Sequence, residues 1–343
     1  MTVPKALCAL AVAAALMLNH AAVAHPELKM TALQVLPRLD LRATGGDPDP
    51  TTVQVEQAEI NVTASLAWDD AELVSLNLQH GFETAMTGRA KDMHFGNLYG
   101  VFNFGLGSPK VKLGQFVVPF GALAEYDTHP LVLQTPFART LGIRIDRGLG
   151  LEGAQGEYDW WLTLTSGDGR ERFDGGWAAT AHVARDYEQG GDVLRWGASV
   201  LVGENMPVFP LDAMSMPMGM DEMVTHTDKW RVALDLDWLR GIDNIRAELV
   251  AGQDEGEFVD GQWLCYEHPF SYDASLAVQV DRWRQSDGTA HGGGVQYHQA
   301  LDDLSGLRLA YEHRWAYRRG LPDLHSDTVT LQYYRDWAWA PSL

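Results

Sequence analysis

The sequence predicts an all-β chain that folds as a transmembrane, antiparallel, up-and-down β-barrel of about 16 strands (range about 14–18), with short periplasmic turns and long external loops. Three observations lead to this prediction: an export signal, apolar and polar residues that alternate along most of the chain, and connections that are alternately short and long. After the export signal, no apolar run approaches the roughly 20 residues of a membrane helix, so strands have to cross the membrane.

Residues 1–24 have the pattern of a secretory signal peptide. Lys5 supplies the positive end, residues 6–18 are apolar, and Ala22-Val23-Ala24 is a cleavage site of small residues. Residues 25–343 are then predicted to form a single barrel domain in the outer membrane of a Gram-negative bacterium. Cleavage leaves Cys265 as the one cysteine of the mature chain, which excludes an intramolecular disulfide.

The alternation of apolar and polar residues has the period of a β-strand. In residues 57–68 the even positions are apolar from Ala58 to Trp68, and residues 229–238 repeat the pattern from Trp230 to Trp238. A soluble sandwich produces the same pattern. A meander of more than about 300 residues without a linker exceeds ordinary sandwiches, however, and this length favours a barrel.

The connections between these segments favour an outer-membrane barrel. Short connections are predicted at residues 69–72, 107–109, 155–158, 187–192, 240–244, 269–272 and 301–305. The connections of the other end are predicted at 82–96, 119–142, 167–176, 204–228, 253–261, 285–288 and 317–326, and all of these except 285–288 are long. Fifteen segments follow residue 53, and an even number is needed, so residues 31–42 are predicted as the first strand. Pro37 then requires a bulge or an edge-like position, and the barrel is expected to close at Trp337 or Trp339.

Aromatic residues near strand ends suit an interfacial girdle. The tryptophans assigned to it are Trp68, Trp160, Trp161, Trp177, Trp196, Trp230, Trp238, Trp283, Trp315 and Trp337.

If the apolar parity faces lipid, the opposite parity lines a water-filled lumen. The pore-lining residues predicted in this way are Arg144, Asp146, Glu152, Arg231, Asp235, Asp237, Arg246, Glu248, Asp281, Arg308, Glu312 and Arg314. Mixed charges across a lumen orient polar solutes and give only a modest ion preference. The plainer alternative is that these residues only keep the wall hydrated.

The negative net charge and the lack of catalytic motifs exclude several classes of function. The formal charge of -20 argues against nucleic acid as a partner, because nucleic acids reward clustered Lys and Arg. The sequence lacks a Gly-x-Ser-x-Gly elbow, a Cys-x-x-Cys-His haem site, a His-Glu-x-x-His zinc motif and a phosphate loop, so no catalytic residue and no enzymatic activity are predicted.

A stretch in the first half of the chain resembles a known family. Pro109-Lys-Val-Lys-Leu-Gly-Gln-Phe-Val-Val-Pro-Phe-Gly121, Arg144-Ile-Asp-Arg-Gly-Leu-Gly150 and Leu162-Thr-Leu-Thr-Ser-Gly167 resemble the phosphate-selective porin O/P-like group of bacterial outer-membrane porins. The resemblance covers about a fifth of the chain. It implies a sixteen- or eighteen-stranded, often trimeric channel with an inward-folded constriction loop, here residues 119–142.

Two features depart from that group. A phosphate-selective pore needs a basic lumen, whereas the predicted constriction loop contributes Glu125, Asp127, His129 and Arg139. Anion selectivity is therefore not expected. The chain also ends in Leu343, where porins of this type usually end in an aromatic residue.

A methionine-rich loop suggests a metal site. Its proposed ligands are Met214, Met216, Met218, Met220, Met223 and His226. Thioethers at alternate positions of an extended segment project to one side, and soft sulfur ligands select Cu(I). The competing interpretation is that these methionines pack as adaptable apolar side chains in the barrel mouth.

The function predicted from these patterns is a porin-like channel for passive, weakly cation-preferring diffusion of ions or small polar solutes. Two alternatives stay open: a barrel sheath around a periplasmic partner such as a multihaem cytochrome, and a copper-handling protein that uses the Met-rich loop. The expected partners are outer-membrane lipid and lipopolysaccharide, reached through cations on acidic residues 254–257, and further copies of the chain in a homotrimer. No cofactor other than Cu(I) is predicted.

Overall fold

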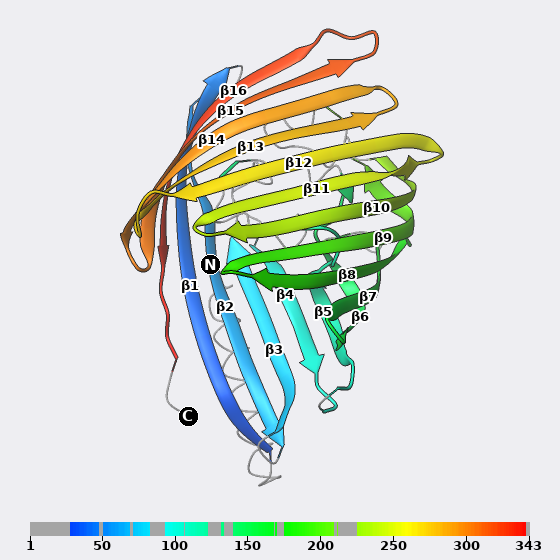
Figure 1. Cartoon of the computed structure of the whole chain (residues 1–343), viewed down its shortest axis with the longest axis vertical. Helices are drawn as coiled ribbons and strands as arrows, with labels where there is room; N and C mark the ends of the chain where they lie inside the picture. Colours follow the sequence, from blue (N-terminus) through cyan, green and yellow to red (C-terminus); the bar gives the residue numbers. More distant parts are fainter. Residues whose placement is uncertain are drawn as a thin grey trace.

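The computed structural model describes residues 28–47, 51–68, 71–82, 93–105, 107–122, 132–133, 140–167, 169, 175–208, 211 and 225–340. In this part of the chain, sixteen antiparallel strands form one closed barrel, in which neighbours in sequence pair and β16 pairs with β1 (Figure 1). The predicted fold class and strand number are confirmed. No helix in these ranges is long and apolar enough to cross a membrane.

The strands are β1 (Leu28–Asp47), β2 (Thr52–Trp68), β3 (Ala71–Phe82), β4 (Met93–Phe102), β5 (Lys110–Val117), β6 (Ile145–Gln155), β7 (Tyr158–Thr165), β8 (Trp177–Gln189), β9 (Asp192–Val208), β10 (Thr225–Arg240), β11 (Asp243–Asp254), β12 (Glu257–Pro269), β13 (Ala274–Gln285), β14 (Gly288–Asp302), β15 (Ser305–Arg318) and β16 (Leu324–Asp336).

The alternation in the sequence corresponds to two faces of the barrel wall. In β10, Val232 and Leu234 are 44% and 59% exposed, whereas Arg231 and Ala233, the residue before each of them, are 0% and 4% exposed. The same split recurs in β15, where Leu309 is exposed and Arg308 is buried. Apolar residues therefore cover the outside, and the polar parity points into the barrel.

Short and long connections alternate as predicted as far as β11, and the connections from β11 to β16 are all short. The predicted long connection at residues 253–261 is wrong, because β11 runs to Asp254 and β12 starts at Glu257, which leaves a two-residue turn. Glu255 and Gly256 both have positive φ in this turn. The polar outer residues at the start of β12 hide the strand pattern, because the wall continues beyond its apolar band.

The seam between β1 and β16 accommodates Pro37. The Pro37 carbonyl accepts a hydrogen bond from the Trp337 amide (2.8 Å), and the regular β1–β16 ladder starts one residue later, at Arg38. Since the nitrogen and carbonyl of a strand residue face the same neighbour, the missing donor faces the end of β16, which is the edge-like position that was predicted. Beyond β16, Trp339 bridges to Val35, so the barrel closes in the predicted region.

Apolar side chains also fill part of the barrel interior near the ends that carry the long connections, here called the long-loop end. One buried cluster joins Val118, Phe120, Leu141, Ile143, Met206 and Leu211 to inward-facing residues of β8 to β15. It includes Trp283, which is 1% exposed. The girdle assignment is wrong for Trp283 and for Trp161, because both share the inward parity of their strands.

Candidate functional site

The connection from β5 to β6 folds into the barrel. Its described residues are 118–122, 132–133 and 140–144, here called the inward segment. Val118, Phe120 and Leu141 are at most 1% exposed and pack on inner-wall residues of β8 to β15. Leu133 belongs to a second buried cluster with Trp263 and Cys265 of β12. The inward segment therefore covers the inner face of this half of the wall.

Hydrogen bonds to the wall hold the inward segment at three places. The Gly121 amide donates to Ser199 Oγ of β9 (2.8 Å), and the Val132 amide donates to Gln296 Oε1 of β14 (2.6 Å). Lys229 Nζ of β10 donates to the Leu141 carbonyl (2.9 Å). Contacts with three separate strands fix the course of the segment across the lumen.

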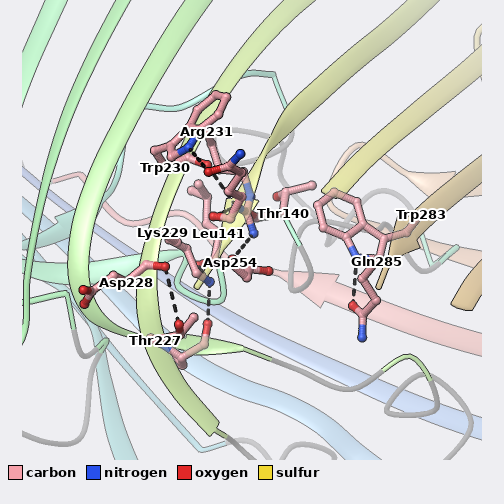
Figure 2. Close-up of polar contacts among 12 residues, drawn as sticks. Thr140, Leu141, Thr227, Asp228, Lys229, Trp230, Arg231, Asp254, Trp283 and Gln285 are labelled. Atoms are coloured by element: carbon pink, nitrogen blue, oxygen red, sulfur yellow. Dashed lines mark hydrogen bonds and ion pairs between the residues drawn. The ribbon is translucent and has the colours of Figure 1, made fainter. Parts of the chain in front are cut away.

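Arg231 makes a further attachment, and Figure 2 shows it beside Thr140 and Asp254. Its Nε donates to the Thr140 carbonyl (2.9 Å), one Nη donates to the Gln253 carbonyl (2.8 Å), and the other pairs with Asp254 (2.6 Å). The guanidinium carbon lies 5.8 Å from the Trp283 ring centroid. Arg231 and Lys229, with these contacts, are here called the β10 clamp. Water does not reach the Arg231 guanidinium group, because the side chain is 0% exposed.

The residues that carry the family resemblance flank the inward segment. Asp146 of β6 is fully buried and accepts hydrogen bonds from Ser166 Oγ (2.6 Å) and the Gly167 amide (2.6 Å). Gly114 of β5 has φ +128°, and a Cβ there would lie 2.2 Å from the Leu98 carbonyl oxygen. The motif therefore places the two ends of the segment and ties β6 to the end of β7.

Asp146→Asn should destabilise the barrel, because an amide group cannot accept both hydrogen bonds. The expected loss in the free energy of unfolding is about 2 kcal/mol, the cost of a lost charge-assisted hydrogen bond. Urea titration of the folded barrel, read by its heat-modifiable electrophoretic mobility, measures this. Asp302→Asn, which alters a half-exposed carboxylate, should lose much less; equal losses would contradict the role of Asp146.

The wall of β2 to β4 is polar on its inner face. Glu59 of β2 accepts from Asn61 Nδ2 (2.9 Å) and from Gln79 Nε2 of β3 (2.7 Å). Gln79 Oε1 in turn accepts from Asn97 Nδ2 of β4 (2.8 Å). The three amide side chains are partly exposed. This ladder of amides contrasts with the apolar packing on the opposite wall.

Ion pairs between adjacent strands, and in one case from β9 across β8 to β7, form a belt near the short turns, here called the ion-pair belt. Its members are Arg38–Asp336 (2.6 Å), Lys112–Glu152 (3.2 Å), Arg195 with Asp186 (3.1 Å) and Asp159 (3.8 Å), and Arg246–Asp237 (3.4 Å). Their side chains are 22% to 49% exposed, so water and ions reach them. Arg195 shares two carboxylates, which leaves this part of the belt acidic.

Comparison with known proteins identifies the class of barrel to which this fold corresponds. No family model and no curated protein matches the chain. Among solved structures, OmpT of Vibrio cholerae is similar with a TM-score of 0.63 and 12% identity, over 89% of this chain and 97% of that one. The outer-membrane channel DcaP of Acinetobacter baumannii gives 0.65 and 10%, over 91% and 98%. The chain has the outer-membrane porin fold. An anion-selective porin from Comamonas acidovorans shares it, with a TM-score of 0.62 and 12% identity, over 91% of this chain and 100% of that one.

Within the porin fold, the residues predicted to line the pore lie on the inward parity but differ in exposure. Those at most 7% exposed are Asp146, Arg231, Glu248, Asp281, Arg308, Glu312 and Arg314. Those of intermediate exposure are Arg144, Glu152, Asp235, Asp237 and Arg246. Arg314 pairs with Asp281 (3.3 Å) and Glu312 (3.2 Å), and these three residues form a buried network on β13 and β15.

Several partly exposed belt residues were missed. Arg38, Lys112, Asp159, Asp186, Arg195 and Asp336 share the inward parity of their strands, and that signal alone would have found them. The predicted constriction residues Glu125, Asp127, His129 and Arg139 lie outside the described residues.

The Met-rich loop also lies mostly outside the described residues, which include His226 but not Met214, Met216, Met218, Met220 or Met223. His226 is exposed at the start of β10. Met206 is 0% exposed and belongs to the interior apolar cluster. Among the described residues, no group of three or more His, Cys, Asp or Glu side chains is arranged to hold a metal ion. Copper binding stays a prediction.

Proposed function

We propose that this protein is an outer-membrane channel for passive, weakly cation-preferring diffusion of ions or small polar solutes. The observation that carries the proposal is the two-sided interior. The inward segment packs against β8 to β15 at the long-loop end, whereas the amides of β2 to β4 and the ion-pair belt near the short turns stay partly exposed. Water and solutes are proposed to pass along this polar side, between the inward segment and β2 to β6.

The paired charges account for a weak rather than a strong preference. Each belt cation lies within 4 Å of a carboxylate, so the pairs largely cancel at a distance. Arg195 faces two carboxylates, and the extra negative charge makes the lumen favour cations. An anion-selective porin has a similar structure, so the proposed cation preference rests on the charged residues of this chain and not on its fold.

The same proposal includes export, assembly and family. Residues 1–24 are proposed to be removed on export, and the chain is proposed to form a homotrimer, since OmpT of Vibrio cholerae is known in a trimer form. Membership of the phosphate-selective porin O/P-like group rests on the motif residues that flank the inward segment.

Single-channel recording in a planar bilayer, with the reversal potential under a salt gradient, tests the channel. Discrete open steps with a small cation preference are expected. A correctly folded barrel that stays silent would contradict the proposal and favour a sheath around a partner protein.

Asp159→Asn with Asp186→Asn should move the reversal potential towards anions, because Arg195 then has no carboxylate partner in the belt. The cation-to-anion permeability ratio should fall roughly twofold at low salt, where screening is weak. Glu157→Gln is the matched control: this carboxylate pairs with Arg185 at the same end of the barrel, but Arg185 lies on the outer parity. An equal shift in the control would contradict the assignment.

A further inference from the structure

A row of polar and aromatic side chains crosses the outer face of β12 to β16. Its members, here called the outer row, are Gln262, Arg282, His291, Trp315 and His325. Each pairs directly with the next in the strand register, and directly opposed residues share one face. In Figure 1 these strands run side by side.

The outer row lies at the long-loop end, just beyond the apolar band. Arg282 has the same parity as Val280, which is 51% exposed, and Trp315 has the same parity as Leu309, also 51% exposed. From Val280 to Arg282 the outer surface thus changes from aliphatic to cationic within one strand repeat. If the long loops are external, this step lies at the boundary between acyl chains and head groups of the outer leaflet.

On β12 and β13 the outer row carries more guanidinium groups than carboxylates. Arg282 (2.9 Å) and Arg284 both pair with Asp260, so two guanidinium groups share one carboxylate. The Arg282 and Arg284 side chains are 30% and 48% exposed and can donate further hydrogen bonds outwards. Arg284 also lies over the Phe258 ring (5.5 Å).

Aromatic and imidazole rings continue the surface across the next strands. His291 stacks on Trp315, with ring centroids 4.9 Å apart and planes 12° apart. Immediately below the row, His313 pairs with Asp327 (2.9 Å), which also accepts from Tyr311 (2.5 Å). Tryptophan and tyrosine prefer the head-group level of a membrane, where one edge of the ring is wet.

Among the described residues, the outer face of β9 and β10 carries the opposite charge to the Arg282 and Arg284 pair. At the same end of β9 and β10, the exposed residues include His226, and the two that carry a formal charge are Glu204 and Asp228. A general interfacial belt would not change sign in this way, and the whole chain is strongly acidic. The local sign therefore matches an anionic partner that touches only this side.

We propose that Arg282, Arg284 and His291 bind the phosphate groups of the outer-leaflet glycolipid, while its acyl chains lie on the apolar band below. Guanidinium groups bind phosphate oxygens in a bidentate manner, and a stacked imidazole adds a third donor. The acidic residues 254–257 are not needed for this contact, and Asp254 is turned inwards to Arg231. This inference rests on the outer-membrane location in the proposed function.

The test uses the folded full barrel in detergent with two probes, bisphosphorylated lipid A and its dephosphorylated form. Binding is measured by native mass spectrometry. The wild-type barrel should prefer the phosphorylated probe by about tenfold or more, and Arg282→Gln with Arg284→Gln should remove most of this preference. Arg282→Lys with Arg284→Lys keeps the charge, loses the bidentate geometry and should retain part of it.

Arg185→Gln is the matched control. Arg185 also pairs with a carboxylate, Glu157, and lies over an aromatic ring, Tyr158, at 5.5 Å, but near the short turns. This variant should bind the phosphorylated probe like the wild type. Heat-modifiable mobility confirms that each variant is folded.

Two results would overturn the proposal. In the first, the double glutamine variant keeps the wild-type preference for the phosphorylated probe. In the second, the double glutamine variant changes its oligomeric state while the two probes bind equally well, which would make the outer row a contact between copies of the chain. Conductance of the same preparations separates this inference from the proposed function. If the double glutamine variant loses the preference for phosphorylated lipid A and conducts normally, the inference is supported. If the wild-type barrel shows this preference but does not conduct, only the proposed channel function is contradicted.

Discussion

Arg231→Met is expected to loosen the inward segment on β10, where Lys229 still holds it, and to raise both the open-channel current and its fluctuation. Methionine has a similar length but leaves the Thr140 carbonyl without its donor and Asp254 without its cation. Breaking a buried, hydrogen-bonded charge pair costs about 3–5 kcal/mol. Single-channel recording measures the current, and urea titration measures the loss in the free energy of unfolding.

Arg185→Met provides the comparison for Arg231→Met. Arg185 lies on the outer parity and contacts Glu157 and Tyr158 near a short turn, far from the inward segment in the fold. Its current should equal that of the wild type. If Arg231→Met leaves both current and stability unchanged, the β10 clamp does not position the inward segment.

Gly142→Ala is expected to displace the same segment by steric repulsion. Gly142 has φ +82°, and a Cβ would lie 2.1 Å from the Pro207 carbonyl oxygen, a backbone atom that cannot rotate away. The left-handed conformation alone costs about 1–2 kcal/mol for alanine, and the overlap with Pro207 adds to that cost. We expect a clear fall in unfolding free energy together with altered conductance.

Gly256→Ala separates the two costs. Gly256 has φ +88° in the turn between β11 and β12, and a Cβ there would meet no atom within 4 Å. This variant should show the conformational cost without any change in current. Matching currents in the Gly142 and Gly256 variants would show that the contact with Pro207 does not shape the lumen.

Arg231→Met and Gly142→Ala both test the position of the inward segment, which the sequence predicted only in outline. The resemblance around Gly114 and Asp146 implied an inward-folded loop, and the described residues of that connection lie inside the barrel. Its attachments were not predictable, because Arg231 and Thr140 are 91 residues apart and nothing in either local pattern points to the other. Arg231 was expected at a wet surface and is instead a dry anchor.

The prediction of the faces failed where tertiary packing overrides residue type. Trp283 was assigned to the membrane interface because it is aromatic and near a strand end, yet it shares the parity of Asp281 and lies inside. Parity, which counts residues, is more reliable here than residue type. The outer row shows the converse case, since Arg282 is charged but lies on the lipid-facing parity.

By itself, the sequence determined the all-β class, the strand number, the two faces of each strand and, as far as β11, the alternation of short and long connections. These follow from period-two patterns and turn spacing, which are local properties of the chain. Only the tertiary structure decided which inward residues are covered by the inward segment and which remain exposed in the ion-pair belt. That division depends on where residues 118–144 pack, and burial arises from contacts between segments that are distant in sequence.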